Sequence, residues 1–377
     1  MLAIGALAIA MAIIATLLFL LSQADGLLLA NGQPVFGDYI SFWSAGRAAL
    51  EGHAARVYDA DFLFGYHQAA VPGVAYVAPF NSPPPFLLLN TALAALPFPL
   101  AALTFLTSSS ALYVYAARKL GPGALIFALT LPAAVYHLGS VQTGLYIAGV
   151  SALALHWLDA RPRAAGALVG LLAIKPHLAI LWPLLLALTG RWRAFAAATV
   201  STLVFCVLAG ALLGFELYPA FIENLTRSQA QVSEMRITTP AYASLYAGLL
   251  GLGASQDLAI AAHAVSAVAA LALAAWLFLR GGRETQGPAL CAATLLISPY
   301  LFFYDFTLLA AGAALIGAPR DRFELAAIVL AWGAALSLPL GYVATLPLCP
   351  LAAWFVLIAA MRRAGTAAPR PAPAPHR

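Results

Sequence analysis

Charged residues divide this chain into long apolar runs, and the lengths of those runs predict its secondary structure. Runs without Asp, Glu, Lys or Arg cover residues 1–24, 62–117, 120–158, 194–215, 258–279, 286–304, 306–318 and 325–361. A helix that crosses a bilayer needs about 20 apolar residues with few or no charges, and some of these runs are long enough for two passes. We therefore predict an all-α integral membrane protein, a polytopic helix bundle of roughly 10 to 12 spans.

Composition agrees with this pattern and excludes an ordinary soluble domain. Of the 377 residues, 63% are hydrophobic and only 9% are charged, whereas soluble chains contain about 25% charged residues. The net charge of +5 comes largely from short loops and the C-terminal tail. It therefore indicates membrane topology and contact with membrane lipids, and no nucleic-acid partner is expected.

The distribution of basic residues predicts which loops face the cytoplasm. Arg and Lys residues cluster at 191–193, 280–283, 319–322 and 362–363, and the positive-inside rule assigns such loops to the cytoplasm. Residues 25–80 and 215–257 then form a first and a second outer loop. Residues 82–117 have two interpretations, because a hairpin at "LPFP" leaves Arg118 and Lys119 outside, whereas one net crossing leaves them inside.

The two ends of the chain and its cysteines complete the domain organisation. Residues 1–24 end in "SQA", which resembles a cleavage site, but no basic residue precedes the run, so we expect an uncleaved first helix. One membrane domain then covers residues 1–363, and the Pro/Ala-rich residues 364–377 are expected to form a disordered cytoplasmic tail. The three cysteines lack CxxC spacing and are interpreted as core residues: Cys206, Cys291 and Cys349.

The stretch "GDYISFWSAG" follows the first apolar run and places a carboxylate at the head of an aromatic segment. Aromatic and small residues recur at helical spacing from Asp38 to Gly52, which predicts a short amphipathic helix in the first outer loop, with its aromatic side against lipid or the bundle. Asp38 has two interpretations. It is a helix N-cap, or it is a general base that deprotonates an acceptor hydroxyl.

Lys175 is the one charge inside the apolar segment 164–190 and needs an explanation. An ionised side chain at mid-bilayer costs about 2.5 to 3.5 kcal/mol, so it requires a partner or water. Pro176 disfavours helix at Lys175, which predicts a broken helix whose backbone lines a cavity. The alternative is a lysine that snorkels from a helix end. His177 either donates a further hydrogen bond to a phosphate or packs in the helix.

Two further stretches contain polar groups in apolar surroundings. "HLGSVQTGLY" contains Gln142, which suits either a hydrogen bond to a hydroxylated ligand or a contact between helices. "ISPYLFFYDF" places Tyr304 and Asp305 beside a proline turn. Asp305 is either a second acid of the site or another N-cap.

The order of these features resembles glycosyltransferase family 87, the polyprenol-phosphate-sugar-dependent enzymes of the GT-C superfamily. The resemblance rests on "GDYISFWSAGRAALEGHAARVYD", "FNSPPPFLLLNTALAALPFPLAALTF", "GSVQTGLY", "AGALVGLLAIKPHLAILWPLLLA" and "ISPYLFFYDF", which together run through nearly the whole chain. Two departures stand out. The family often has Asn-Gly-Gln where this chain has Ser140, Val141 and Gln142, and often Gln where this chain has His177.

The resemblance implies a GT-C-like bundle and an enzyme that transfers a hexose, mannose first, from a polyprenyl-phosphate donor to a lipid or glycan acceptor. Asp38 would act as general base. The reaction that the resemblance implies uses no metal or other cofactor. Lys175, His177 and Arg47 would bind the donor phosphate, with Gln142, Tyr304 and Asp305 contacting the acceptor or sugar. The Ala-rich composition is typical of a high-GC bacterium, so the enzyme is expected in a bacterial plasma membrane with its active site facing the periplasm.

Three other functions agree with parts of the pattern. A GT-C transferase with another lipid-linked donor, such as aminoarabinose or a phosphoethanolamine-like group, would share these features. A flippase or transporter for lipid-linked sugars would use Lys175 to bind phosphate during alternating access, although no inverted repeat is evident. A structural membrane scaffold predicts that neither Asp38 nor Lys175 matters, and it leaves the acid-rich first outer loop unexplained.

Overall fold

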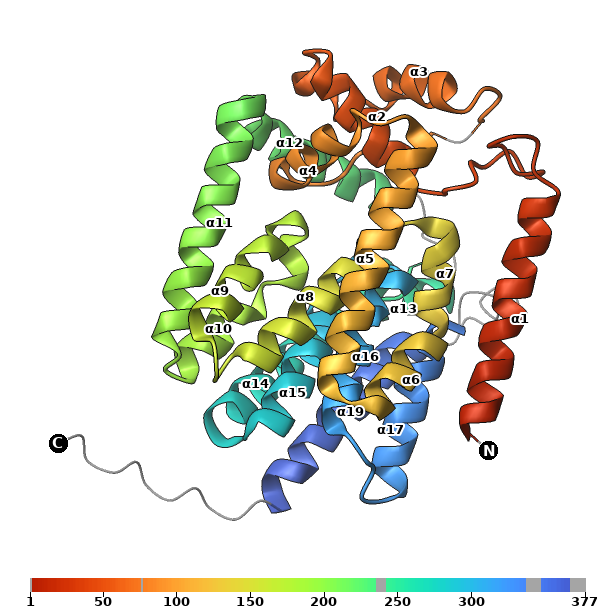
Figure 1. Ribbon diagram of the computed structural model, residues 1–377. Helices are drawn as coiled ribbons and strands as arrows, with labels where there is room; N and C mark the ends of the chain where they lie inside the picture. The colour runs from red at the N-terminus through yellow and green to blue at the C-terminus, as the bar shows by residue number, and fades with distance from the viewer. Residues whose placement is uncertain (1, 76, 235–241, 337–346, 367–377) are drawn as a thin grey trace.

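The computed structural model describes residues 2–75, 77–234, 242–336 and 347–366, which fold into helices joined by short turns (Figure 1). In this part of the chain the backbone forms three isolated β-bridges and no longer strand. The prediction of an all-α protein is therefore confirmed. Of the disordered tail predicted for residues 364–377, residues 364–366 instead continue the last helix, Leu348–Thr366, and residues 367–377 lie outside the described residues.

Five of the described helices are long and apolar enough to cross a membrane. A further pair, α6 and α7, passes the same test as one segment bent by 50°, where Pro132 disfavours helix at the preceding Leu131. Large apolar side chains such as Leu203 on α11 and Val265 on α14 are exposed, which suits contact with lipid. The bounds are α1 (Leu2–Ser22), α5 (Phe98–Leu120), α6 (Pro122–Thr130), α7 (Pro132–Ser140), α11 (Trp192–Leu213), α14 (Gln256–Arg280) and α19 (Leu348–Thr366).

The remaining helices of the bundle are shorter. At 1.5 Å per residue, a helix of 7 to 15 residues is roughly 10 to 22 Å long and covers only part of a hydrocarbon core of about 30 Å. The figure of 10 to 12 spans therefore stays a prediction. These helices are α8 (Gly144–Trp157), α9 (Pro162–Leu171), α10 (Leu181–Leu188), α13 (Leu245–Gly251), α15 (Arg283–Ile297), α16 (Thr307–Ile316) and α17 (Arg322–Gly333), with 3₁₀ turns η2 (Leu172–Ile174), η3 (Pro176–Leu178), η4 (Phe303–Phe306) and η5 (Ala334–Leu336).

One end of the molecule, which we call the α2 end, is built from four helices that lie at the top of Figure 1. They are α2 (Tyr39–Leu50), α3 (Ala60–Ala70), α4 (Pro84–Leu93) and α12 (Leu217–Glu234), with the 3₁₀ turn η1 (Ala54–Arg56). The amphipathic helix predicted in the first outer loop is α2. A Cβ at Gly46 would overlap the backbone of Asn90, so glycine is what allows α2 to lie this close to α4.

The aromatic side of α2 packs against the bundle. Tyr39 is fully buried, with its ring 5.1 Å from that of Phe105, and the Phe42 ring lies 4.8 Å from that of Phe86. Aromatic side chains bury large apolar areas, so these contacts fix α2 on α4 and α5. The aromatic side of the predicted helix therefore faces the bundle.

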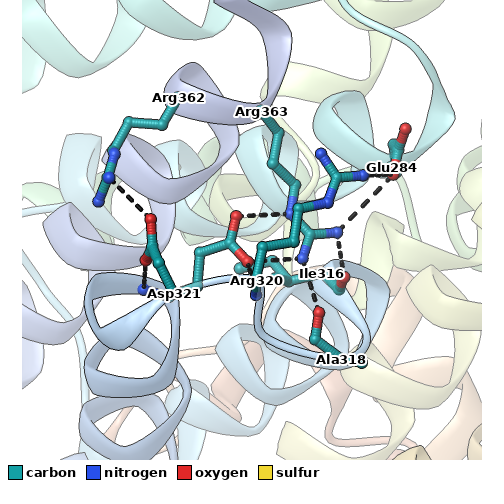
Figure 2. A network of polar contacts seen from close by, with 8 residues as sticks. Glu284, Ile316, Ala318, Arg320, Asp321, Arg362 and Arg363 are labelled. Atoms are coloured by element: carbon teal, nitrogen blue, oxygen red, sulfur yellow. Dashed lines mark hydrogen bonds and ion pairs between the residues drawn. The ribbon is translucent and has the colours of Figure 1, made fainter. Parts of the chain in front are cut away.

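The opposite end, which we call the basic end, brings together the four basic clusters named above. Arg363 pairs with Glu324 at 2.7 Å, and Arg362 pairs with Asp321 at 2.7 Å. Figure 2 shows Arg362 beside Asp321 and Arg363 beside Glu284. Arg191 adds a bond of 3.0 Å to Asp159 in the same part of the fold. The basic loops therefore gather on one side of the bundle, as the positive-inside interpretation requires.

The course of α5 decides between the two interpretations of residues 82–117. Helix α4 stays at the α2 end, and α5 then runs once through the bundle to its opposite end (Figure 1). Arg118 and Lys119 lie in the last turn of α5. The segment therefore makes one net crossing and carries these two residues to the side of the basic end.

The cysteines agree with their interpretation as packing residues. Cys291 and Cys349 are buried, and Cys206 is partly exposed. No group of three or more His, Cys, Asp or Glu side chains among the described residues is arranged to hold a metal ion.

Candidate active site

Asp38 stands at the N-terminus of α2, but its carboxylate does not cap that helix. Its side chain makes no capping hydrogen bond. Instead, Oδ2 accepts a hydrogen bond of 2.8 Å from Nε2 of Gln142, and the Asp38 N–H donates to the Ser140 carbonyl oxygen at 3.2 Å. The carboxylate is thus turned toward the junction of α7 and α8, as expected of a group with a role other than capping.

The residue before Asp38 explains how the loop comes so close to this junction. Gly37 has φ +47°, and a Cβ there would lie 2.7 Å from the Gly139 carbonyl oxygen. Glycine adopts positive φ without steric cost and leaves room for the neighbouring backbone. Gly37 therefore allows the first outer loop to dock against the C-terminal end of α7.

The environment of Asp38 favours its action as a base. Asp38 lies in the loop between α1 and α4, outside the long apolar helices, and is only partly exposed. Desolvation by the surrounding protein raises the pKa of its carboxyl above the ordinary 3.8, while the Gln142 hydrogen bond and the nearby Lys175 ammonium lower it to a smaller extent. A raised pKa makes a carboxylate a stronger base near neutral pH.

The α7–α8 junction has an unusual backbone. Val141 adopts φ 45° and ψ 57°, the left-handed region, and is the one non-glycine residue with positive φ among the described residues. A β-branched residue is rarely found there, and such conformations cluster at functional sites. Val141 ends α7 and directly precedes Gln142, so this turn sets the direction of the Gln142 side chain.

Lys175 lies at the predicted break in its apolar segment. Helix α9 tightens into η2, and Lys175 then has non-helical backbone angles of φ −148° and ψ 72°. Pro176 begins η3, and α10 starts at Leu181. Its ammonium pairs with Oδ1 of Asp305 at 2.5 Å and lies 4.8 Å from the centre of the Tyr304 ring. The broken helix is confirmed, and the lysine is paired within the bundle instead of snorkelling from a helix end.

Asp305 is the third residue of η4 and not its N-cap, which is Phe302, and the Asp305 carboxylate has two partners. Oδ1 accepts from Lys175, while Oδ2 accepts a 3.1 Å hydrogen bond from the backbone N–H of Phe302 at the start of η4. The Asp305 side chain is 1% exposed and that of Lys175 is 16% exposed. The carboxylate therefore fixes the turn backbone and the cation together.

The predicted site residues gather around this pair, with one exception. Lys175 is within electrostatic range of Asp38, and His177, whose side chain is exposed, is within range of both Lys175 and Asp305. Arg47 instead pairs with Glu51 at 2.8 Å on the surface, roughly 14 Å along α2 from Asp38. The structure does not show Arg47 in contact with the other predicted site residues.

Several polar groups near Gln142 were not identified from the sequence. His137, Ser140 and Thr143 carry buried side-chain atoms without a hydrogen-bond partner in the part of the chain that is described. Nothing in the stretch "HLGSVQTGLY" distinguishes them from packing residues, because their burial depends on how α7 meets distant segments. They become visible as a group only in the folded protein.

The gathered residues offer two complementary chemical functions. Asp38 is a carboxylate oriented by an amide, and it is suited to accept a proton from a hydroxyl. Lys175 is a cation held in position by Asp305 and Tyr304, and it is suited to stabilise negative charge on a leaving phosphate. Base and cation approach each other from segments more than one hundred residues apart, which is the arrangement expected of an assembled active site.

Comparison with known proteins gives one match. The sequence model of glycosyltransferase family 87 matches residues 80–299, more than half of the chain. No curated protein and no solved structure matches. The matched range contains Gln142, Lys175 and His177, whereas Asp38 precedes it and Asp305 follows it.

Proposed function

Because the chain belongs to glycosyltransferase family 87, we propose that this membrane glycosyltransferase moves a hexose from a polyprenyl-phosphate donor to a lipid or glycan acceptor. Mannose is the first candidate for the sugar, and Asp38 is the general base. The proposal places the reaction at the outer face of a bacterial plasma membrane. No nucleotide and no metal ion takes part in the proposed chemistry.

The observation that carries this proposal is the hydrogen bond between Gln142 and Asp38. An aspartate that served only as a helix cap would direct its oxygens at the first-turn N–H groups of α2. Here Oδ2 is held 2.8 Å from Gln142 Nε2 and no capping bond is made. The contact fixes one carboxylate oxygen and leaves Oδ1 without a hydrogen bond to α2, ready to accept the proton of an acceptor hydroxyl.

The proposed reaction is a single displacement at the anomeric carbon. The acceptor oxygen forms a bond to that carbon while the bond to the phosphate oxygen breaks, and the hydroxyl proton passes to Asp38. The electron pair of the broken bond leaves with the polyprenyl phosphate, whose added negative charge Lys175 stabilises. His177 is proposed to assist at the phosphate, and Gln142 and Tyr304 at the sugar or acceptor.

The location at the outer face is supported by the two ends of the bundle. Basic loops gather at the end opposite α2, and basic loops remain in the cytoplasm. Asp38 directly precedes α2, so the proposed base belongs to the other side of the membrane. A polyprenyl-phosphate sugar is the kind of activated donor that a membrane enzyme can bind there without a nucleotide.

Sugar transfer by the purified protein in lipid nanodiscs tests the proposal. Polyprenyl-phosphate mannose, glucose and arabinose are supplied in parallel with lipid and glycan acceptors, and wild type is compared with Asp38→Asn. General-base assistance is worth about 10²- to 10⁴-fold, so the variant should lose transfer by that factor while still binding donor.

Asp59→Asn is the matched control for this experiment. Asp59 lies in the same loop, and its Oδ1 caps α3 through the Phe62 N–H at 3.1 Å. Asparagine also caps helices well, so this variant should keep wild-type turnover. Equal activity of Asp38→Asn and wild type would reject the general-base role. Movement of intact donor across the bilayer of closed proteoliposomes, without transfer, would instead identify a flippase.

A further inference from the structure

His137 is a fully buried histidine whose ring nitrogens are both without a hydrogen-bond partner. It lies in the last turns of α7 with none of its surface exposed, and neither Nδ1 nor Nε2 finds a partner within the described chain. His67 shows the usual alternative, because its nitrogens lie 2.9 Å from Ser44 Oγ and 3.0 Å from the Ala78 carbonyl oxygen. Buried polar groups are nearly always hydrogen-bonded, so His137 needs an explanation.

The position of His137 connects it to the proposed active site. Its carbonyl oxygen accepts a 2.9 Å hydrogen bond from the N–H of Val141, the residue before Gln142. Helix α7 packs on η4 through the Tyr136 and Phe303 rings, 5.9 Å apart, and η4 carries Asp305. The imidazole is within electrostatic range of the Lys175 ammonium. His137 therefore belongs to the same region as the base and the cation.

The orphaned atoms are concentrated on this segment. Ser140 Oγ and Thr143 Oγ1 are also buried without partners in the described structure, and both residues flank the Val141–Gln142 turn. Three polar side chains at intervals of three residues, all close to Gln142 in sequence, leave hydrogen-bonding capacity unused. This concentration indicates a surface that is completed by a bound molecule.

The chemistry of a buried imidazole narrows the class of that molecule. A buried charge needs a partner of opposite sign, and the charged group in range of His137 is itself a cation, so the ring is neutral. A neutral imidazole has one N–H donor and one lone-pair acceptor. A phosphate diester only accepts hydrogen bonds, so it would pair with the N–H nitrogen of the imidazole alone. Hydroxyl groups both donate and accept hydrogen bonds, so they can pair with both ring nitrogens.

We propose that His137 binds a sugar hydroxyl during transfer, with Ser140 and Thr143 completing a wall that recognises the sugar. The inference rests on the proposed function and assigns the sugar-recognition surface within it. None of the surface of His137 is exposed in this structure, so the sugar reaches it when the side chains that cover it move apart. His137 is then a specificity-determining residue, because it contacts the sugar and takes no proton from the reacting hydroxyl.

The test compares His137→Phe with wild type in nanodiscs, using polyprenyl-phosphate mannose and its single deoxy derivatives as donors. Phenylalanine fills the same space without polar atoms, so thermal stability should stay equal or rise. The KM for the donor or for the acceptor should increase about tenfold or more, and the affected constant tells which sugar supplies the hydroxyl.

The deoxy donors separate recognition from packing. If the hydroxyl belongs to the donor, wild type should discriminate against one deoxy derivative, and His137→Phe should lose that discrimination and no other. If it belongs to the acceptor, the same pattern should appear with deoxy acceptors. The inference would be overturned if His137→Phe lost activity equally with every deoxy derivative, or if its kinetics were equal to those of wild type. His137→Leu, which also lacks polar side-chain atoms, provides the same comparison if the phenylalanine variant does not fold.

His67→Phe is the control for a buried histidine with satisfied nitrogens. It should lower thermal stability, because it removes two hydrogen bonds, and leave the discrimination among deoxy donors unchanged. Absence of sugar transfer by wild type would reject the proposed function together with this inference. Transfer by wild type with no effect of His137→Phe would reject the inference alone.

Discussion

The Lys175 ammonium and the Asp305 carboxylate meet at 2.5 Å although 130 residues separate them in the chain. The pair joins the break between α9 and α10 to the η4 turn, and it makes a cation tolerable in an apolar segment. An anionic donor that binds Lys175 must share this cation with Asp305. The pair therefore serves both the stability of the bundle and the proposed chemistry.

A double-mutant cycle separates these two roles. Lys175→Met or Asp305→Asn alone leaves one buried charge unpaired and should destabilise the protein by about 3 to 5 kcal/mol, while the double variant should lose less than either single one. Turnover should be lost in both variants that lack Lys175. Thermal unfolding and initial rates in nanodiscs provide the two readouts. Full turnover of a stable Lys175→Met protein would contradict the role at the phosphate.

The pH dependence of transfer should report on Asp38. The base must be ionised, and burial raises its pKa above 3.8, so kcat/KM should fall as the pH drops through that raised value. The Gln142 hydrogen bond lowers this pKa, so Gln142→Leu should move the acid limb to higher pH. The measurement is a pH–rate profile of both proteins. An unchanged acid limb in the variant would mean that another group controls it.

The basic end offers a stability test that leaves the proposed chemistry untouched. Arg363 and Glu324 are 5% and 4% exposed, and Arg363 also donates to the Ile316 and Ala318 carbonyl oxygens (Figure 2). Glu324→Gln should destabilise the fold by about 1 to 3 kcal/mol, because the buried guanidinium loses its closer carboxylate and keeps the longer, 3.7 Å pair with Glu284. Thermal unfolding measures the loss, and turnover per folded molecule should stay at the wild-type level.

Arg362→Gln is the matched comparison for this pair. In the ion pair between Arg362 and Asp321, both side chains are about half-exposed. Exposed ion pairs contribute about 1 kcal/mol or less to the free energy of unfolding. A loss of stability as large as that of Glu324→Gln would show that burial does not explain the difference between the two pairs.

Charges in apolar surroundings were the features that sequence predicted best. Lys175 stands out because an unpaired charge is costly inside an apolar segment, and Pro176 predicts a break that α9, η2 and η3 then show. The short helix after Asp38 follows from local periodicity. Such predictions succeed because the cost of burying a charge depends on the residue and its immediate neighbours.

Pairings between distant segments could not be predicted in the same way. Whether Asp38 caps α2 or faces Gln142, and whether Lys175 finds Asp305, depends on how separate helices dock. Arg47 appeared suitable by proximity in sequence, but it lies toward the far end of α2 and pairs with Glu51. Val141 carries no signal of its left-handed backbone, since valine ordinarily avoids it.

Asp38 is attached to the α7–α8 junction twice, through its N–H to Ser140 and through its carboxylate to Gln142. The first outer loop is therefore anchored to the bundle at the residue proposed to perform the chemistry. The segment that carries Asp38 cannot move away from the bundle unless both bonds break together. Substrate exchange must then rely on movement of other segments, with Asp38 as the fixed point against which donor and acceptor are aligned.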